Sequence, residues 1–174
     1  MSTTTSFSTP STLPKRFTYT RRKILSTVAS VFDPMGLVSP FVLLGKQILQ
    51  EACAAGLDWD DELPDLLKQR YKDWCDQHQE LSSITIPRCI KPLDFNVSTV
   101  EFHHFADAST SGYGVCSCAR LIDSNGSSSV ALVFAKSRVS PIKPITVPVL
   151  NSLQQFLLFA ALLRWNVNSN LISL

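Results

Sequence analysis

Acidic residues are missing from the last part of this 174-residue chain: beyond Asp123 there is neither aspartate nor glutamate. A site for two divalent cations needs several convergent carboxylates, so that part of the chain cannot supply one. The sequence also lacks any run of the roughly 18–20 apolar residues that cross a bilayer. Its five cysteines are odd in number, and their spacing is not that of a disulfide framework, which favours reduced thiols. We therefore expect an intracellular, cytoplasmic protein with no membrane partner.

Apolar residues make up 45% of the chain and charged residues only 17%, which is enough apolar material for a core. The length predicts one domain, or a helical piece followed by a small sheet piece. A formal net charge of +2 is too small to predict nucleic-acid binding by itself. The charge is uneven, however, because every charged residue after Asp123 is basic.

The first part of the chain has helical periodicity. Thr20 can cap a helix over residues 21–32, and Pro34 followed by Gly36 ends it. Ser39 and Pro40 are typical of an N-cap and a first helical position, so a second helix should run to about Ala55. A third should cover about 64–81. The apolar faces expected on the three helices are, in order, Ile24, Val28 and Val31; Val42, Leu43, Ile48 and Leu49; and Leu67, Tyr71, Trp74, His78 and Leu81.

From Thr99 the hydrophobic period changes to that of strands. We expect an edge strand within 84–90, then three strands over 100–107, 113–121 and 129–139. Asn125-Gly126 is a strong hairpin signal between the last two. A final apolar helix should run from Pro148 to about Trp165. The pattern predicts an α+β fold: a helical region, then a partial antiparallel sheet of three strands with a helix at its end.

Residues 102–114 carry one acidic side chain, Asp107, along a strand into a Gly-bounded turn and a second strand. A metal-dependent nuclease of the ribonuclease H type begins in this way. A turn-capping role for Asp107, bonding the backbone near Ser109, is the alternative.

Taken together, several motifs resemble the family catalogued as Pao retrotransposon peptidase, a segment of the BEL/Pao retrotransposon Pol polyprotein. They run in family order through nearly the whole chain. The matching residues are 22–26 (RKILS), 31–40 (VFDPMGLVSP), 57–61 (LDWDD), 105–109 (FADAS) with 112–114 (GYG), and 135–144 (AKSRVSPIKP) followed by 146–148 (TVP).

The Ser/Thr-rich start of the chain has no apolar core and predicts a disordered lead-in at 1–18. The resemblance implies a helical region at 19–83 like the thumb and connection of a reverse transcriptase, then a linker or edge strand at 84–98. It implies a truncated ribonuclease H-like domain at 99–174. It implies Mg²⁺ or Mn²⁺ as cofactor in the intact family domain, with Asp107 as the first metal-binding carboxylate. After Thr-x-Pro the family has Arg-Leu-Glu, and that Glu resembles the second carboxylate. Here the run is Val149-Leu150-Asn151. Because Asn151 offers an oxygen without charge, we expect no bound metal and no activity in isolation.

In the parent polyprotein the partners implied are an RNA–DNA hybrid or template-primer and the remainder of Pol. The expected location is cytoplasmic, or nuclear within a retroelement complex. Basic side chains that could contact phosphates are Arg21, Arg22, Lys23, Lys136, Arg138 and Lys143.

Two other chemistries fit poorly. The peptidase label finds no support, since neither Asp107 nor Asp123 stands in an Asp-Thr-Gly or Asp-Ser-Gly motif. A zinc site from His103, His104, Cys116 and Cys118 is disfavoured because adjacent histidines on a strand point to opposite faces.

Two functions of different classes therefore remain. The first is a Pol polyprotein segment between reverse transcriptase and ribonuclease H, catalytically inactive alone. The second is a domesticated or stand-alone protein-interaction module on the same scaffold, without nucleic-acid chemistry.

Overall fold

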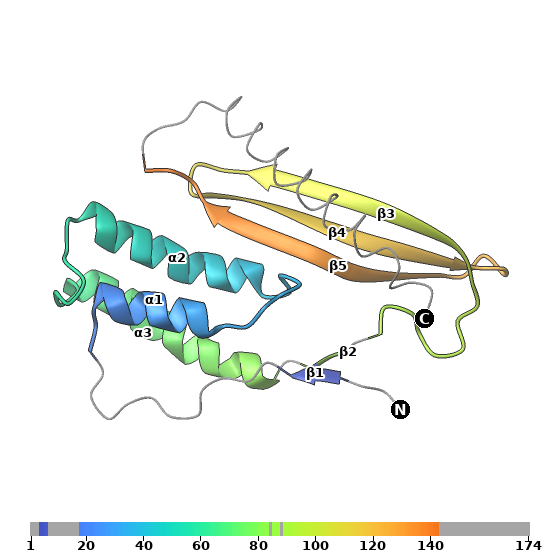
Figure 1. The fold of residues 1–174 in the computed structure, drawn as a ribbon, viewed down its shortest axis with the longest axis horizontal. Helices are drawn as coiled ribbons and strands as arrows, with labels where there is room; N and C mark the ends of the chain where they lie inside the picture. Colours follow the sequence, from blue (N-terminus) through green and yellow to red (C-terminus); the bar gives the residue numbers. More distant parts are fainter. Residues whose placement is uncertain (1–3, 7–17, 84, 88, 143–174) are drawn as a thin grey trace. The chain divides into compact units, whose positions relative to one another are not determined.

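A computed structural model describes residues 4–6, 18–83, 85–87 and 89–142. The chain forms two compact units, one of Met1–Pro34 with Val38–Arg88 and one of Met35–Leu37 with Cys89–Leu174. Figure 1 shows helices in the first and a sheet in the second. The mixed α+β class predicted from the sequence is confirmed. Lys143, Asn151 and the final helix predicted at 148–165 lie outside the described residues. No helix in the described ranges is long and apolar enough to cross a membrane.

Three helices form the first unit: α1 (Arg21–Ser30), α2 (Ser39–Ala54) and α3 (Asp65–Glu80), with a 3₁₀ turn at Leu81–Ser83. The Thr20 hydroxyl accepts a hydrogen bond from the Lys23 N–H at 3.3 Å, which confirms the predicted cap. Helix α1 ends two residues earlier than expected. The Ser30 hydroxyl donates to the Thr27 carbonyl at 2.7 Å, and such side-chain bonds compete with helix continuation.

The start of α2 also differs from the prediction. The helix begins at Ser39, and its N-cap is Val38, whose side chain makes no capping bond. The Asp33 carboxylate instead accepts the Val38 N–H at 2.9 Å. The N–H of the N-cap residue itself is thus satisfied by a side chain five residues upstream.

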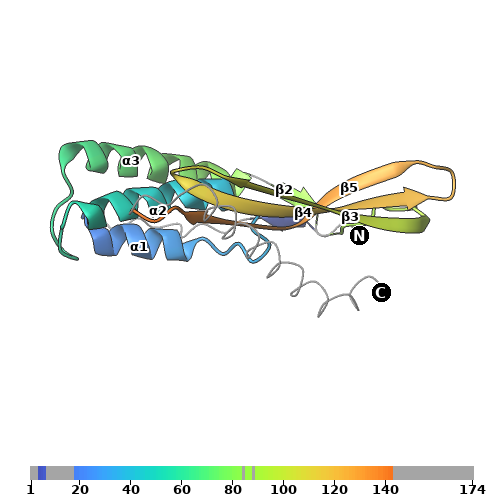
Figure 2. The ribbon, with the colours of Figure 1, turned by 90° about the horizontal axis from the view of Figure 1, so that it is seen from above.

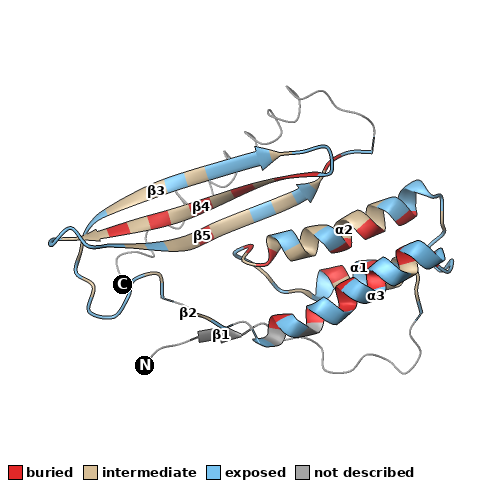
Figure 3. Cartoon of the chain, turned by 180° about the vertical axis from the view of Figure 1, so that it is seen from behind, coloured by how far each residue is buried: buried red, intermediate tan, exposed pale blue. Residues whose placement is uncertain are grey.

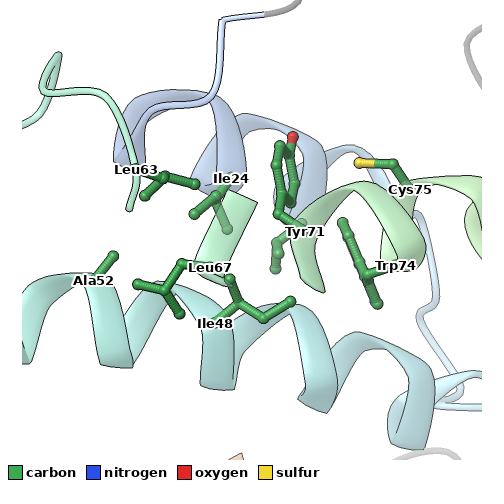
Figure 4. Close-up of a cluster of buried hydrophobic side chains, with 9 residues drawn as sticks. Ile24, Ile48, Ala52, Leu63, Leu67, Tyr71, Trp74 and Cys75 are labelled. Atoms are coloured by element: carbon green, nitrogen blue, oxygen red, sulfur yellow. The ribbon is translucent and has the colours of Figure 1, made fainter. Parts of the chain in front are cut away.

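The helical core is a single cluster, drawn in Figure 4. The stripe predicted on α3 is confirmed, because Leu67, Tyr71, Trp74, His78 and Leu81 are all buried. Phe41 stacks on the Trp74 ring with centroids 4.9 Å apart, and the indole N–H donates to the Phe41 carbonyl at 3.0 Å. Stacked aromatic pairs of this kind stabilise a core beyond the area they bury.

The face predicted for α2 is partly wrong. Its buried residues are Gly45, Ile48 and Ala52, whereas Val42, Leu43 and Leu49 are only half-buried. A β-carbon on Gly45 would stand 2.6 Å from the Trp74 ring and 2.8 Å from a Val28 methyl group. The missing side chain is therefore what admits Trp74 between the helices, and a glycine carries no hydrophobic signal in the sequence.

A small two-stranded sheet joins β1 (Thr4–Ser6) to β2 (Thr85–Pro87), with Thr5 opposite Ile86. The edge strand expected within 84–90 is present in shorter form. The strand at Thr4–Ser6 contradicts the prediction that residues 1–18 are disordered. Antiparallel pairing satisfies backbone groups whatever the side chains are, so a polar Ser/Thr run can form a strand without an apolar pattern.

The second unit contains one antiparallel sheet in the order β3-β4-β5, formed by β3 (Val97–Ala108), β4 (Gly112–Asp123) and β5 (Ser128–Val139). All three predicted strands are confirmed, each slightly longer than expected. Figure 2 shows them as one twisted layer. Buried residues alternate along β4, the central strand, as Figure 3 shows. One face of β4 is thus buried and the other more open.

The β4–β5 connection is a three-residue loop rather than the two-residue turn that Asn125-Gly126 suggests. Within the described residues only Asp94 among the non-glycines has positive φ, so Asn125 is not left-handed, and Gly126 takes that conformation at φ +82°. The Asp123 carboxylate accepts the N–H groups of Asn125 and Ser127 at 2.9 and 2.8 Å. Asp123 is therefore a turn residue.

The outer edge of β5 is covered by the short segment Met35–Leu37, which belongs to the same unit. The Ala135 N–H donates to the Met35 carbonyl at 2.7 Å. Gly36 has φ +79°, and a β-carbon there would stand 1.7 Å from the Ala135 carbonyl oxygen. Only glycine fits, both in conformation and in space. Two of the motifs that carry the family resemblance, around Gly36 and around Ala135, therefore meet.

Candidate functional site

Asp107 lies near the end of β3, opposite Gly114 of β4, which is opposite Ser137 of β5. Residues opposite one another in a sheet share a face, so these three form one row. The Asp107 side chain is exposed, and its carboxylate accepts the Ala108 N–H at 2.9 Å. Gly114 contributes no side chain to this row, and a β-carbon there would stand 3.3 Å from the Lys136 carbonyl oxygen.

The turn that follows Asp107 is held by another residue. The Ser109 hydroxyl donates to the Gly112 carbonyl at 2.9 Å and lies 3.2 Å from the Gly112 N–H. Ser140 adds a bond from its hydroxyl to the Ser109 carbonyl at 2.9 Å. The alternative role of Asp107 as the turn cap is thus largely taken by Ser109, and Asp107 keeps most of its acceptor capacity.

The next carboxylate on the same face of β3 is Glu101. Six residues of strand separate it from Asp107, which corresponds to about 20 Å. Glu101 is also already paired, with Arg120 at 3.1 Å and with His103 at 3.4 Å. In the part of the chain that the structure describes, no three His, Cys, Asp or Glu side chains are placed to hold a metal ion. These residues alone do not fit a two-metal centre.

Two of the predicted phosphate contacts, Lys136 and Arg138, lie on β5. Lys136 is opposite Val115 and Arg138 opposite Tyr113, whose side chains are buried on the other face of the sheet from Asp107. A β-bulge sets this arrangement: the register shifts by one residue between the pairs Cys118–Leu132 and Ser117–Phe134. The structure therefore does not bring these two bases together with Asp107.

The basic residues at the start of α1 belong to the helical unit. Arg22 forms a two-pronged ion pair with Asp60, with N–O distances of 2.7 and 2.9 Å, and this contact lowers the pKa of the Asp60 carboxyl. The Arg21 guanidinium donates to the Leu57 carbonyl and lies 4.6 Å above the Trp59 ring. These contacts fix the loop Leu57–Asp61 to α1. Lys23 supplies the capped N–H at the start of the helix.

The alternative zinc site would need His103 or His104 together with Cys116 and Cys118, and these side chains do not form one. His104 and Ser117 share a hydrogen bond of 2.7 Å on one face of the sheet, whereas His103 lies opposite Cys118 on the other. The two histidines thus point to opposite faces, as predicted. Cys116 and Cys118 are free thiols, and burial raises the pKa of the Cys116 thiol, which disfavours the metal-binding thiolate.

Sequence reasoning missed the Glu101–Arg120 ion pair and the segment at Gly36. The ion pair depends on strand register, which the sequence does not reveal. The Asp-Pro-Met-Gly turn was visible, but only as the end of a helix and not as a contact with a distant strand.

No curated protein and no solved structure matches this chain. The family described as the Pao retrotransposon-like RNaseH-like domain matches residues 20–171, which is most of the sequence. That match agrees with the motifs quoted above and with a sheet of three antiparallel strands whose first carries Asp107. The chain therefore belongs to the Pao retrotransposon-like RNaseH-like domain family.

Proposed function

We propose that this chain is the part of a BEL/Pao-type Pol polyprotein that lies between reverse transcriptase and ribonuclease H, and that it does not cleave RNA by itself. Its helical unit would then serve as the thumb and connection, and its sheet as the first half of the nuclease. The absence of cleavage is proposed because Asp107 has no other carboxylate close to it among the described residues. The nearest carboxylate on its face of β3 is six residues away and paired with a guanidinium.

Metal chemistry supports this reading. Mg²⁺ or Mn²⁺ in a ribonuclease H-like centre would activate water and stabilise the leaving oxygen, and it needs anionic oxygen ligands close together. Asp107 offers one such ligand. The sequence beyond Asp123 supplies no further carboxylate side chain, and the described residues contain no group of three His, Cys, Asp or Glu side chains that could hold a metal ion.

The test is a cleavage assay on an end-labelled RNA–DNA hybrid with Mg²⁺ or Mn²⁺. We expect no product above that of the Asp107→Asn variant, which keeps the size of the side chain and removes its charge. Reproducible cleavage by the unmodified chain that Asp107→Asn abolishes would contradict the proposal.

Contact with the hybrid is a separate part of the proposal and is expected to be weak and sensitive to salt. Lys136 and Arg138 are exposed on the sheet, whereas the Arg22 guanidinium is held by Asp60. Replacing Lys136 and Arg138 by alanine together should lower the slope of log affinity against log salt by about 2, since each phosphate contact contributes about 0.9. Arg22→Ala serves as the matched control and should leave the slope unchanged. Equal effects of the two variants would refute this assignment.

A protein-interaction module without nucleic-acid chemistry is the second candidate. One observation favours it: Arg21 and Arg22, which could have contacted phosphates, are engaged with the loop at Leu57–Asp61. Absence of any salt-dependent hybrid binding, in a chain that unfolds cooperatively, would support this candidate over the first.

A further inference from the structure

Two cysteines, Cys116 and Cys118, are two residues apart on β4, the central strand of the sheet. The side chains of such residues point to the same face, because the pleat of a strand has a period of two. The pairing of this stretch with β3 is regular, with Phe105 opposite Cys116 and His103 opposite Cys118. Both thiols therefore lie next to each other on the face of the sheet that also carries Asp107.

Both thiols are accessible from the β3 side. Cys116 and Cys118 are each half-buried. The residue opposite the first, Phe105, is 58% exposed, and the side chain opposite the second, His103, is 49% exposed. A small reagent in solution therefore reaches the two sulfur atoms without displacing a packed core side chain.

The two thiols are in hydrogen-bond contact. Burial raises the pKa of the Cys116 thiol, and the Cys118 thiol beside it raises that pKa further through its charge and through the hydrogen bond. The thiolate is the form that binds metal ions and attacks disulfides, so a raised pKa disfavours both reactions. Chemistry that uses neutral S–H groups is not affected in this way.

Strand geometry also disfavours a direct bond between the two sulfur atoms. Residues two apart on one strand have α-carbons about 6.7 Å apart, and their β-carbons point in the same direction. A disulfide prefers α-carbons about 5.5–6 Å apart and β-carbons about 3.8 Å apart. Joining Cys116 directly to Cys118 would therefore distort β4, whereas a single atom bonded to both sulfurs bridges the longer distance.

Within the described ranges the pair has no third metal ligand. The His103 ring lies 3.4 Å from the Glu101 carboxylate, and no three His, Cys, Asp or Glu side chains are placed to hold a metal ion. A structural ion such as Zn²⁺ takes about four ligands. The pair therefore suits a ligand that forms two bonds to sulfur and needs no further bond from the protein.

We propose that Cys116 and Cys118 form a dithiol site for trivalent arsenic compounds of the type R–As(OH)₂, where R is a hydroxyl or an organic group. Each thiol proton moves to a hydroxyl group of the arsenic compound, two water molecules leave, and two As–S bonds replace two As–O bonds. Arsenic stays trivalent, so the reaction needs no oxidant or reductant. The site is independent of the proposed function, since it uses neither Asp107 nor a divalent cation.

The probe is phenylarsine oxide, added to the full, reduced chain at neutral pH. We expect one equivalent to bind, with the intact mass rising by one phenylarsenic group, and the number of titratable thiols to fall from five to three. Ethanedithiol should reverse the binding, whereas an equal concentration of a monothiol should not. A chain that keeps all its titratable thiols would overturn the proposal.

Serine variants identify the pair. Cys116→Ser and Cys118→Ser each leave a single thiol at the site, so each should weaken binding roughly 100-fold or more, because the second As–S bond is no longer intramolecular. Cys53→Ser and Cys89→Ser are the matched controls, since both cysteines are exposed and lie in other segments. They should leave the affinity unchanged. Undiminished binding by Cys116→Ser or Cys118→Ser would show that other thiols hold the arsenic atom.

Oxidation tests the geometric argument. Diamide, which oxidises thiols to disulfides, should not join Cys116 to Cys118 in the folded chain, because the strand holds their β-carbons too far apart. A disulfide between these two residues, found by peptide mapping, would contradict the proposal. Should a serine variant lose its cooperative unfolding transition, mapping of the arsenic-bridged peptide in the unmodified chain decides which thiols are used.

Discussion

Replacing Gly36 by alanine should release the segment Met35–Leu37 from the edge of β5. The structure separates two costs of this change. The first is conformational, because φ is +79° and a left-handed backbone costs an L-residue about 1–2 kcal/mol. The second is steric, because the new β-carbon would stand 1.7 Å from the Ala135 carbonyl oxygen and 2.4 Å from its carbon.

The steric cost cannot be relieved by a side-chain rotation, since both atoms belong to the backbone. The segment must move away from β5, which breaks the hydrogen bond from the Ala135 N–H to the Met35 carbonyl at a cost of about 1 kcal/mol. Adding the two costs gives a loss of about 2–3 kcal/mol for Gly36→Ala.

Gly126→Ala is the matched control. Gly126 lies in the same unit at φ +82°, but no atom stands within 4 Å of the position its β-carbon would take. This variant should lose only the conformational cost of about 1–2 kcal/mol. Urea denaturation of both variants measures the difference, and amide exchange at Ala135 reports whether the segment has left the strand. Equal losses of stability, with the Ala135 amide still protected, would refute the reasoning.

Three further predictions concern the core and the hairpin. Gly45→Ala should destabilise the helical unit by about 1–2 kcal/mol, because crowding against Trp74 outweighs the gain in helix propensity; urea denaturation measures it. Burial lowers the pKa of His78 below its ordinary 6.5, so the unfolded chain binds the proton more readily. Stability should therefore be full above about pH 6.5 and fall as the pH drops through the folded pKa, and His78→Phe should reduce that fall in denaturation curves at pH 7.5 and 5. Asp123→Ala removes the acceptor of two turn N–H groups and should cost about 1–2 kcal/mol in the same assay, whereas Asp123→Asn should cost less.

Much of the local structure could be predicted because short-range chemistry sets it. The Thr20 cap, the stripe on α3 and the three strands follow from side-chain type and hydrophobic period, and the structure contains all of them. The predictions failed where a distant partner decides. The buried face of α2 depends on the Trp74 ring, which occupies the space that a side chain at Gly45 would fill. The segment Thr4–Ser6 forms a strand because β2 offers it backbone partners.

The lack of carboxylates beyond Asp123 was determined by the sequence alone, and with it the expectation that Asp107 lacks anionic partners. Which side chains surround Asp107 was decided only by the tertiary structure. Without a bulge, the β4–β5 register that starts at the hairpin turn would place Lys136 opposite Gly114. Lys136 would then lie in the same row as Asp107. The one-residue bulge places Ser137 there instead and turns Lys136 to the other face. Side chains alternate with a period of two along a strand, so one extra residue reverses every face after it, and no local pattern in this sequence marks where that residue is accommodated.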